Sequence, residues 1–243
     1  MKLSTIRALI KLKFVLTLKN ISAIIGSVLA LGFAILFKST LHAAPFAAPG
    51  MNKSFFILQM FFIFNAVMSG IMMTSIPMAQ EKEKKTIRVL MTSSVNEFEY
   101  LIAATIPPFI IIFLTDLLIV PLSGVSFTVS KWVAYIVISI FTILLSMVIG
   151  FIIGVLSRKV SDTSYWVMPV LLPLVLIPQL SHTNAVFSKL SEYLYTGVMV
   201  HALNNIYFQK IPYMSMLNIS VIMFEFIIAI LIFAISFRKR GLS

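Results

Sequence analysis

The sequence predicts an all-α integral membrane protein with six transmembrane helices, and three observations carry this prediction. Of the 243 residues, 60% are hydrophobic and 11% are charged, and the mean hydropathy of +1.03 is far above that of a water-exposed domain. Six apolar runs approach the roughly 20 residues that a helix needs to cross a bilayer core. The basic residues gather between these runs, so the net charge of +11 is interpreted as topology information and not as a nucleic-acid surface.

The six apolar runs are interpreted as spans of a single transmembrane domain that comprises residues 1–243. They lie at Ile21–Phe37, Phe55–Met78, Leu101–Pro121, Val133–Leu156, Ser164–Leu180 and Leu217–Phe237. The first run follows a long basic stretch and has no clean small-x-small cleavage site at a suitable distance. It is therefore predicted to stay as an anchor and not to be cleaved as a signal peptide.

Residues 1–20 precede the first span and mix apolar side chains with five cations. Arg7 and Lys11 share one helix face at i, i+4 spacing, whereas Lys13 intrudes on the apolar side. This pattern favours an interfacial helix on an anionic inner leaflet. A plain basic flank of the first span is the alternative.

The basic residues also predict which ends of the spans face the cytoplasm. With the N-terminus inside, 14 of the 19 basic residues fall in inner segments: five in 1–20, four in 80–100, two at 158–159 and three at 238–240. The outer segments keep only Lys38, Lys53, Lys131, Lys189 and Lys210. This asymmetry follows the positive-inside rule. It predicts cytoplasmic N- and C-termini and places segment 80–100 in the cytoplasm.

The fifth span and the segment after it are the least regular part of the pattern. Pro169, Pro173 and Pro178 each remove a backbone donor, so the fifth helix is expected to be kinked or broken. Residues 181–213 are too polar for a span yet rich in Leu, Tyr, Phe and Val. Ser191–Tyr207 has a helix-compatible composition, which predicts short helices on the outer side.

The segment QEKEKKTIRVLMTSSVNEFEY, residues 80–100, holds half of the acidic residues of the chain. Glu81 and Glu83 continue the second span into water, and an apolar stripe that includes Leu90 follows. Ser94 is placed to cap the next helix, with Glu97 three residues later in a capping-box pattern. The segment is thus predicted to be a helix, a turn and a helix start held between two spans.

The acid-x-acid pair Glu81 and Glu83, then Thr86, Leu90 and the sequence Ser-Val-Asn-Glu-Phe-Glu resemble a known coupling segment. The segment they resemble is the coupling segment of the export-type (type 2) permease subunits of ATP-binding-cassette (ABC) transporters. The family often has Gly where this chain has Lys85. The resemblance implies a cytoplasmic coupling helix between spans 2 and 3, and an N-terminal connecting helix that touches the ATPase. It also implies short re-entrant helices between spans 5 and 6. The implied ATPase-coupling interface comprises Arg7, Lys11, Glu81, Glu83, Lys85, Thr86, Leu90, Ser94 and Glu97.

The resemblance implies a permease subunit that moves an amphipathic or hydrophobic substrate outward across a bacterial cytoplasmic membrane. The substrate classes it suggests are a peptide antibiotic, a toxin-like peptide, a drug or a lipid-linked molecule. Its partners would be an ABC ATPase subunit, membrane lipids and a second permease, in a homodimer or a heterodimer. ATP and Mg would be bound by the partner ATPase, and no cofactor is expected in this chain.

The residues themselves argue against an enzyme. No G-x-x-x-x-G-K-[ST] loop, no H-E-x-x-H motif and no G-x-S-x-G elbow occurs, and the chain has no Cys. The three histidines, His42, His182 and His201, fall in predicted outer loops without metal-ligand spacing, so solvated histidines and no metal site are expected.

Two acids lie within predicted spans, where an ionisable group is expensive. Asp116 is near the outer end of the third span. It could therefore have a snorkelled or helix-capping role, or it could lie on the substrate path. Glu225 is nearer mid-span and is the better candidate for a contact on the path or with a neighbouring subunit. Met68 and Met72 offer an adaptable lining for hydrophobic cargo, with ordinary core or lipid-facing methionine as the alternative.

Gly150 and Gly154 form a G-x-x-x-G pair in the fourth span, which favours close helix packing within the subunit over dimerisation. Two other functions stay open from the sequence. One is a non-transporting immunity or sensor protein that binds a peptide at its outer loops. The other is an ion channel or exchanger that uses Asp116 and Glu225.

Overall fold

A computed structural model of the chain describes residues 3–42, 47, 49–87 and 96–241, and every regular element in those ranges is helical. The elements are α1 (Leu3–Lys19), α2 (Ile21–Thr40), α3 (Lys53–Phe64), η1 (Asn65–Ser69), α4 (Gly70–Glu83), α6 (Glu97–Ser123), α7 (Val129–Leu156), α8 (Val160–Gln179), α9 (Ala185–Glu192), α10 (Tyr195–Tyr207), α11 (Met216–Ser236) and η2 (Phe237–Gly241). The prediction of an all-α chain is confirmed for the described residues.

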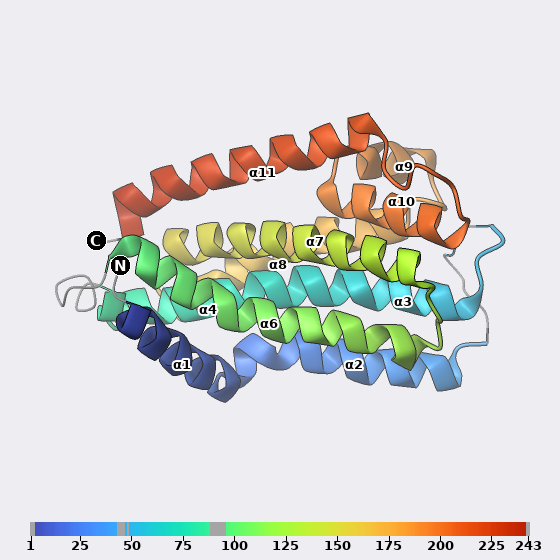
Figure 1. Ribbon diagram of the computed structural model, residues 1–243. Helices are drawn as coiled ribbons and strands as arrows, with labels where there is room; N and C mark the ends of the chain where they lie inside the picture. Colours follow the sequence, from blue (N-terminus) through green and yellow to red (C-terminus); the bar gives the residue numbers. More distant parts are fainter. Residues whose placement is uncertain (1–2, 43–46, 48, 88–95, 242–243) are drawn as a thin grey trace.

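Six helices are long and apolar enough to cross a membrane, as predicted. They span Ile21–Thr40, Lys53–Glu83, Glu97–Ser123, Val129–Leu156, Val160–Gln179 and Met216–Lys239. Their long axes run roughly alongside one another, and the marked N- and C-termini lie at the same end of the bundle (Figure 1). The architecture is that of a multi-pass membrane protein.

The second span forms the centre of the bundle and consists of α3, the π-helix η1 and α4 in one continuous rod. In its apolar window 78% of the residues are buried, against 11% for the span that contains α11. α7 packs tightly along α4 because three glycines remove the side chains between them. A Cβ on Gly150 would lie 2.6 Å from the Ile71 carbonyl oxygen, and one on Gly154 would lie 2.7 Å from Cβ of Met78. The G-x-x-x-G pair thus packs inside the chain, and Gly70 of α4 approaches Ser146 in the same way.

The N-cap of α6 lies two residues later than predicted. Asn96 is the N-cap, its side chain accepts a hydrogen bond from the amide of Phe98 at 3.4 Å, and the Glu99 carboxylate accepts one from the Asn96 amide at 3.2 Å. The capping role predicted for Glu97 is therefore wrong, because Asn96 and Glu99 satisfy the helix start. Ser94 lies outside the described residues.

α8 runs without interruption through Pro169, Pro173 and Pro178, so the fifth span is not broken. Each proline removes one donor but has a φ angle suited to a helix, and transmembrane helices tolerate such residues. Beyond α8, the predicted short helices are observed as α9 and α10. His201 lies on α10 and is not a solvated loop residue; burial, with a smaller contribution from His182, lowers its pKa.

Candidate functional site

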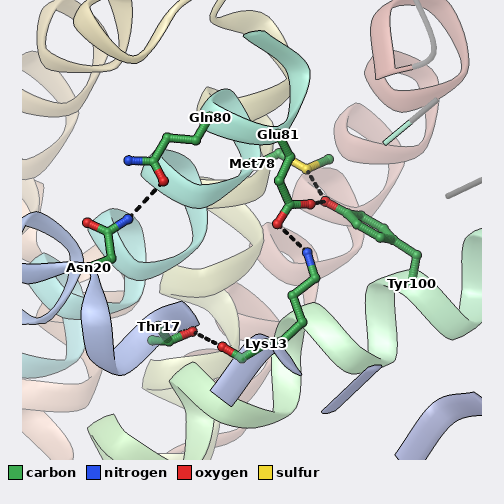
Figure 2. Close-up of polar contacts among 7 residues, drawn as sticks. All are labelled: Lys13, Thr17, Asn20, Met78, Gln80, Glu81 and Tyr100. Atoms are coloured by element: carbon green, nitrogen blue, oxygen red, sulfur yellow. Dashed lines mark hydrogen bonds and ion pairs between the residues drawn. The ribbon is translucent and has the colours of Figure 1, made fainter. Parts of the chain in front are cut away.

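The candidate site lies at the end of the bundle where α1, the last turn of α4 and the first turn of α6 meet. The Lys13 ammonium of α1 forms an ion pair with Oε1 of Glu81. The Tyr100 hydroxyl donates a hydrogen bond to Oε2 of the same carboxylate at 2.7 Å, and Sδ of Met78 lies 3.2 Å from that hydroxyl. Figure 2 shows the three helices converging on Glu81. We call Lys13, Glu81 and Tyr100 the inner junction.

The inner junction is shielded from solvent. Lys13 and Tyr100 are buried, and the Glu81 side chain is 14% exposed. The Lys13 ammonium also lies 4.4 Å from the centroid of the Tyr100 ring, in cation–π geometry. A buried charge needs partners of this kind, because removal of one member leaves the other charge uncompensated. The junction therefore fixes α1 against the ends of α4 and α6.

The position of Lys13 explains why α1 looked imperfectly amphipathic in the sequence. Leu9, Lys13 and Thr17 repeat at i, i+4 and i+8, and all three are buried on the face that packs against α6. Lys13 therefore does not interrupt the buried face, because its charge is neutralised by the ion pair with Glu81. Leu12 and Leu16 lie off this face and are 50% and 49% exposed.

The last turn of α4 makes further polar contacts with neighbouring helices. Oε1 of Gln80 accepts a hydrogen bond from Asn20, the residue between α1 and α2, at 3.0 Å. The Lys82 ammonium donates to the carbonyl of Val155 near the end of α7. The Glu83 carboxylate accepts from the amide of Val160, the first residue of α8, at 3.0 Å. Residues 80–83 thus contact the ends of α7 and α8 as well as α1 and α6. We call residues 80–83 the α4 hub.

The other residues of the predicted coupling interface that the structure describes are exposed. Exposed side chains are those of Arg7, Lys11, Glu83, Lys85, Thr86 and Glu97. Leu90 and Ser94 lie outside the described residues. Glu81 differs from these exposed residues because its carboxylate is shielded from solvent and bonded to Lys13 and Tyr100. Lys85 has a φ of +56°, a left-handed conformation that favours glycine.

A second polar cluster lies inside the bundle around Asp116, and it corrects the interpretation of that residue as snorkelled or helix-capping. Asp116 is fully buried. One carboxylate oxygen accepts a hydrogen bond from the Asn65 side chain and the other from the Ser139 hydroxyl, both at 2.7 Å. The Tyr135 hydroxyl donates to the Asp116 carbonyl at 2.9 Å. Asp116 points inward because these donors come from η1 and α7.

Asn65 connects this cluster to α2. Its carbonyl oxygen accepts from the Ser27 hydroxyl at 2.8 Å, and its amide nitrogen also donates to the carbonyl of Ile112. Asn65 opens the π-helix η1, an element that often occurs where a helix serves a function. Asn65 was not predicted as a site residue, although an amide in the middle of the apolar run Phe55–Met78 is itself a signal.

Glu225 is half-buried and turns toward α10, the short helix beside it. Its carboxylate accepts a hydrogen bond from the backbone amide of Tyr195, the first residue of α10, at 3.0 Å. Leu194, the N-cap residue, supplies no side-chain cap, so Glu225 from α11 satisfies that helix start. The Tyr195 hydroxyl lies 2.9 Å from the Ser146 hydroxyl of α7. Met68 and Met72 are half-buried and pack against the central apolar cluster.

The described residues contain no group of three or more His, Asp or Glu side chains that could hold a metal ion. Compared with known proteins, the chain matches no family model and no curated protein. The polar contacts at the α4 hub are therefore the main basis for interpreting function.

Proposed function

We propose that the chain is the membrane-spanning permease subunit of an export-type ABC transporter. One observation supports this proposal above the others: the last turn of the most buried span holds polar contacts to four neighbouring helices. Gln80 and Glu81 contact the α1 region, Glu81 also contacts α6, Lys82 contacts α7 and Glu83 contacts α8. A soluble partner that moved this turn would displace several spans together.

In this proposal the exposed side chains beside the α4 hub form the docking surface for the ATPase. Lys85 and Thr86 follow the hub after one intervening residue, and Arg7, Lys11 and Glu97 are exposed on α1 and α6. The partner ATPase binds ATP and Mg, and its closure pushes on residues 80–100. The inner junction makes the response collective, since α1 and α6 are fixed to α4 by a buried ion pair and a hydrogen bond.

The proposal places residues 80–100 and both termini in the cytoplasm, in agreement with the distribution of basic residues. The cargo is amphipathic or hydrophobic, with peptide antibiotics, toxin-like peptides, drugs and lipid-linked molecules as its classes. Met68 and Met72 stay candidates for its lining. Asp116 and Glu225 hold partners within the chain, so we assign them to the fold of the subunit. The exposed apolar faces of α2 and α11 are left for lipid and for a second permease copy, identical or related.

The structure sharpens the choice of variants that test the proposal. Glu81→Ala would disrupt the inner junction, so a loss of ATPase could result from misfolding as well as from weaker binding. The variant Lys85→Glu/Thr86→Glu instead changes two exposed side chains next to the α4 hub. Lys189→Glu/Lys210→Glu is a matched control, because both of those lysines are exposed in the segment between α8 and α11.

The experiment is purification of each variant from native membranes, with measurement of the amount of ATPase subunit that accompanies it. We expect the amount of ATPase that accompanies the Lys85→Glu/Thr86→Glu variant to be at least about tenfold lower, which corresponds to a loss of about 1.4 kcal/mol in binding free energy. The control should retain it. Wild-type protein without an ATPase would overturn the proposal and favour the peptide-binding immunity or sensor protein. Equal loss in both variants would contradict the assigned docking surface.

A further inference from the structure

A pocket beside the inner junction combines apolar walls with cations. Its volume is about 550 Å³, within the roughly 300–1,000 Å³ of ligand sites. The lining comes from the C-terminal half of α1, the start of α2 and the end of α4, and from Thr86 after it. The apolar lining residues are Leu12, Leu16, Ile21 and Pro77. We call this space the α1–α4 pocket.

The α1–α4 pocket carries an excess of positive charge. Lys13, Lys19, Lys84 and Glu81 are its charged lining residues, and Lys13 and Glu81 neutralise each other in the inner junction. Lys19 and Lys84 are exposed and have no ion pair with any described residue. Asn20 and Gln80 also line the pocket, and one amide hydrogen of Asn20 is used in the hydrogen bond between them. Two cations are therefore available to an anionic group in the pocket.

The pocket lies where the apolar parts of the first two candidate spans end. The first candidate span begins at Ile21 and the second ends at Glu83, and residues next to both of these ends line the pocket. Leu16 is 49% exposed and Ile21 is 73% exposed, so apolar side chains face outward directly beside the lysines. A soluble anion would use the lysines and leave the apolar wall exposed. A molecule with both an anionic head and hydrocarbon chains would satisfy both parts.

We infer that the α1–α4 pocket binds an anionic phospholipid, with its phosphate between Lys19 and Lys84 and an acyl chain along Leu12, Leu16 and Ile21. Lysine near a bilayer surface attracts anionic lipids, and the apolar side chains gain from contact with hydrocarbon. The bound lipid would hold α1 against α4 and so stabilise the geometry of the inner junction. This inference does not depend on the proposed export function.

The test uses the full-length protein in zwitterionic detergent, titrated with phosphatidylglycerol, and follows lipid binding by native mass spectrometry and the melting temperature. We expect phosphatidylglycerol to bind and to raise the melting temperature, because a ligand that binds only the folded state stabilises it. Phosphatidylcholine should bind much more weakly. In the Lys19→Gln/Lys84→Gln variant, affinity for phosphatidylglycerol should fall roughly 25-fold, at about fivefold per lysine.

Lys189→Gln/Lys210→Gln is the matched control and should bind phosphatidylglycerol as the wild type does. Leu16→Asn should weaken lipid binding, and inorganic phosphate or glycerol phosphate should fail to compete with the lipid. Unchanged affinity in the Lys19→Gln/Lys84→Gln variant, or an equal loss in the control, would overturn the inference. Competition by free phosphate would make the pocket a soluble-anion site and overturn it too. If the variant lost only an accompanying ATPase and kept its lipid, the pocket would belong to the partner, which also overturns the inference.

Discussion

The central span of α3, η1 and α4 and the peripheral span of α11 are both apolar, yet they occupy opposite environments. In the central span 78% of the apolar window is buried, and Asn65, Ser69 and Thr74 lie in its interior. In the peripheral span 11% of the window is buried, and its single acid, Glu225, turns inward to α10. Within a bilayer, polar side chains are inexpensive only where protein supplies their partners. Mean hydropathy is lower in the central span than in the span of α11, in keeping with the polar residues that lie buried in the central span.

The contrast between the two spans predicts that substitutions against the central span cost more than substitutions against α11. Polar contacts of the central span come from several helices at once, as at Asn65 and Glu81. In the part of the chain that the structure describes, Glu225 of α11 contacts one backbone amide of another helix. We therefore expect the loss in free energy of unfolding to be larger where the substituted side chain contacts more helices.

The largest loss is expected where α7 meets the central span. In Gly150→Ala the added Cβ would collide with Oγ1 of Thr74 and lie 2.6 Å from the Ile71 carbonyl oxygen, and the backbone cannot yield locally. We expect the free energy of unfolding to fall by about 3 kcal/mol, at the upper end for overpacking. Reversible unfolding in mixed micelles would measure it.

Gly32→Ala is the matched control for this prediction. Gly32 lies on α2, a Cβ added there would meet no atom within 4 Å, and alanine is favoured over glycine in helices by up to about 1 kcal/mol. Its variant should be as stable as the wild type or more so. Equal losses at Gly150 and Gly32 would contradict the close packing of α7 on α4.

The second-largest loss is expected at the inner junction. Among the described residues, Lys13→Gln would leave the Glu81 carboxylate with the Tyr100 hydroxyl as its one remaining partner. We expect a loss of about 2 kcal/mol because Glu81 keeps some access to water. Lys11→Gln, a change at an exposed lysine one half-turn away, should have almost no effect. The double variant Lys13→Gln/Glu81→Gln should recover most of the loss. Additive losses in the double variant would show that the two charges are not coupled.

A smaller loss is expected at Asp116, where the partners are neutral. Asp116→Leu would remove the acceptor of the Ser139 hydroxyl, which can turn to a backbone carbonyl of its own helix. It would also remove the acceptor of one amide hydrogen of Asn65, whose other hydrogen would still donate to the Ile112 carbonyl. We expect a loss of about 1.5 kcal/mol, in the range for one buried donor left unpaired. Asp116→Asn keeps the shape and an acceptor, so it should cost less than Asp116→Leu. The reverse order would indicate that the charge of Asp116, and not its hydrogen bonds, stabilises the bundle.

The sequence predicted the spans better than it predicted the contacts between them. Apolar runs of about 20 residues identified all six candidate spans, since burial in lipid requires that length whatever the neighbours are. The partners of the acids were not predictable, because Lys13 and Glu81 are 68 residues apart and Asn65 and Asp116 are 51 apart. The packing of α1 and α4 against α6 brings Lys13 to Glu81, and the packing of η1 on α6 brings Asn65 to Asp116.

Local signals were informative where the helix itself decides the geometry. The close approach at Gly150 and Gly154 follows from residue size alone. The predicted capping box failed because two overlapping patterns, Ser94 with Glu97 and Asn96 with Glu99, fit the same segment. The observed helix start uses the second pattern, which also directs Tyr100 toward Glu81.

The smallest loss is expected at α11, where Glu225 supplies one acceptor. Glu225→Ala would leave the Tyr195 amide at the start of α10 without a cap, which costs about 1 kcal/mol. Glu225→Gln retains an acceptor and should cost less. Because the contact joins only two helices, hydrogen exchange at Tyr195 should accelerate while exchange at η1 stays unchanged. Accelerated exchange at both places would mean that α11 supports the central span after all, and the contrast between the two spans would fail.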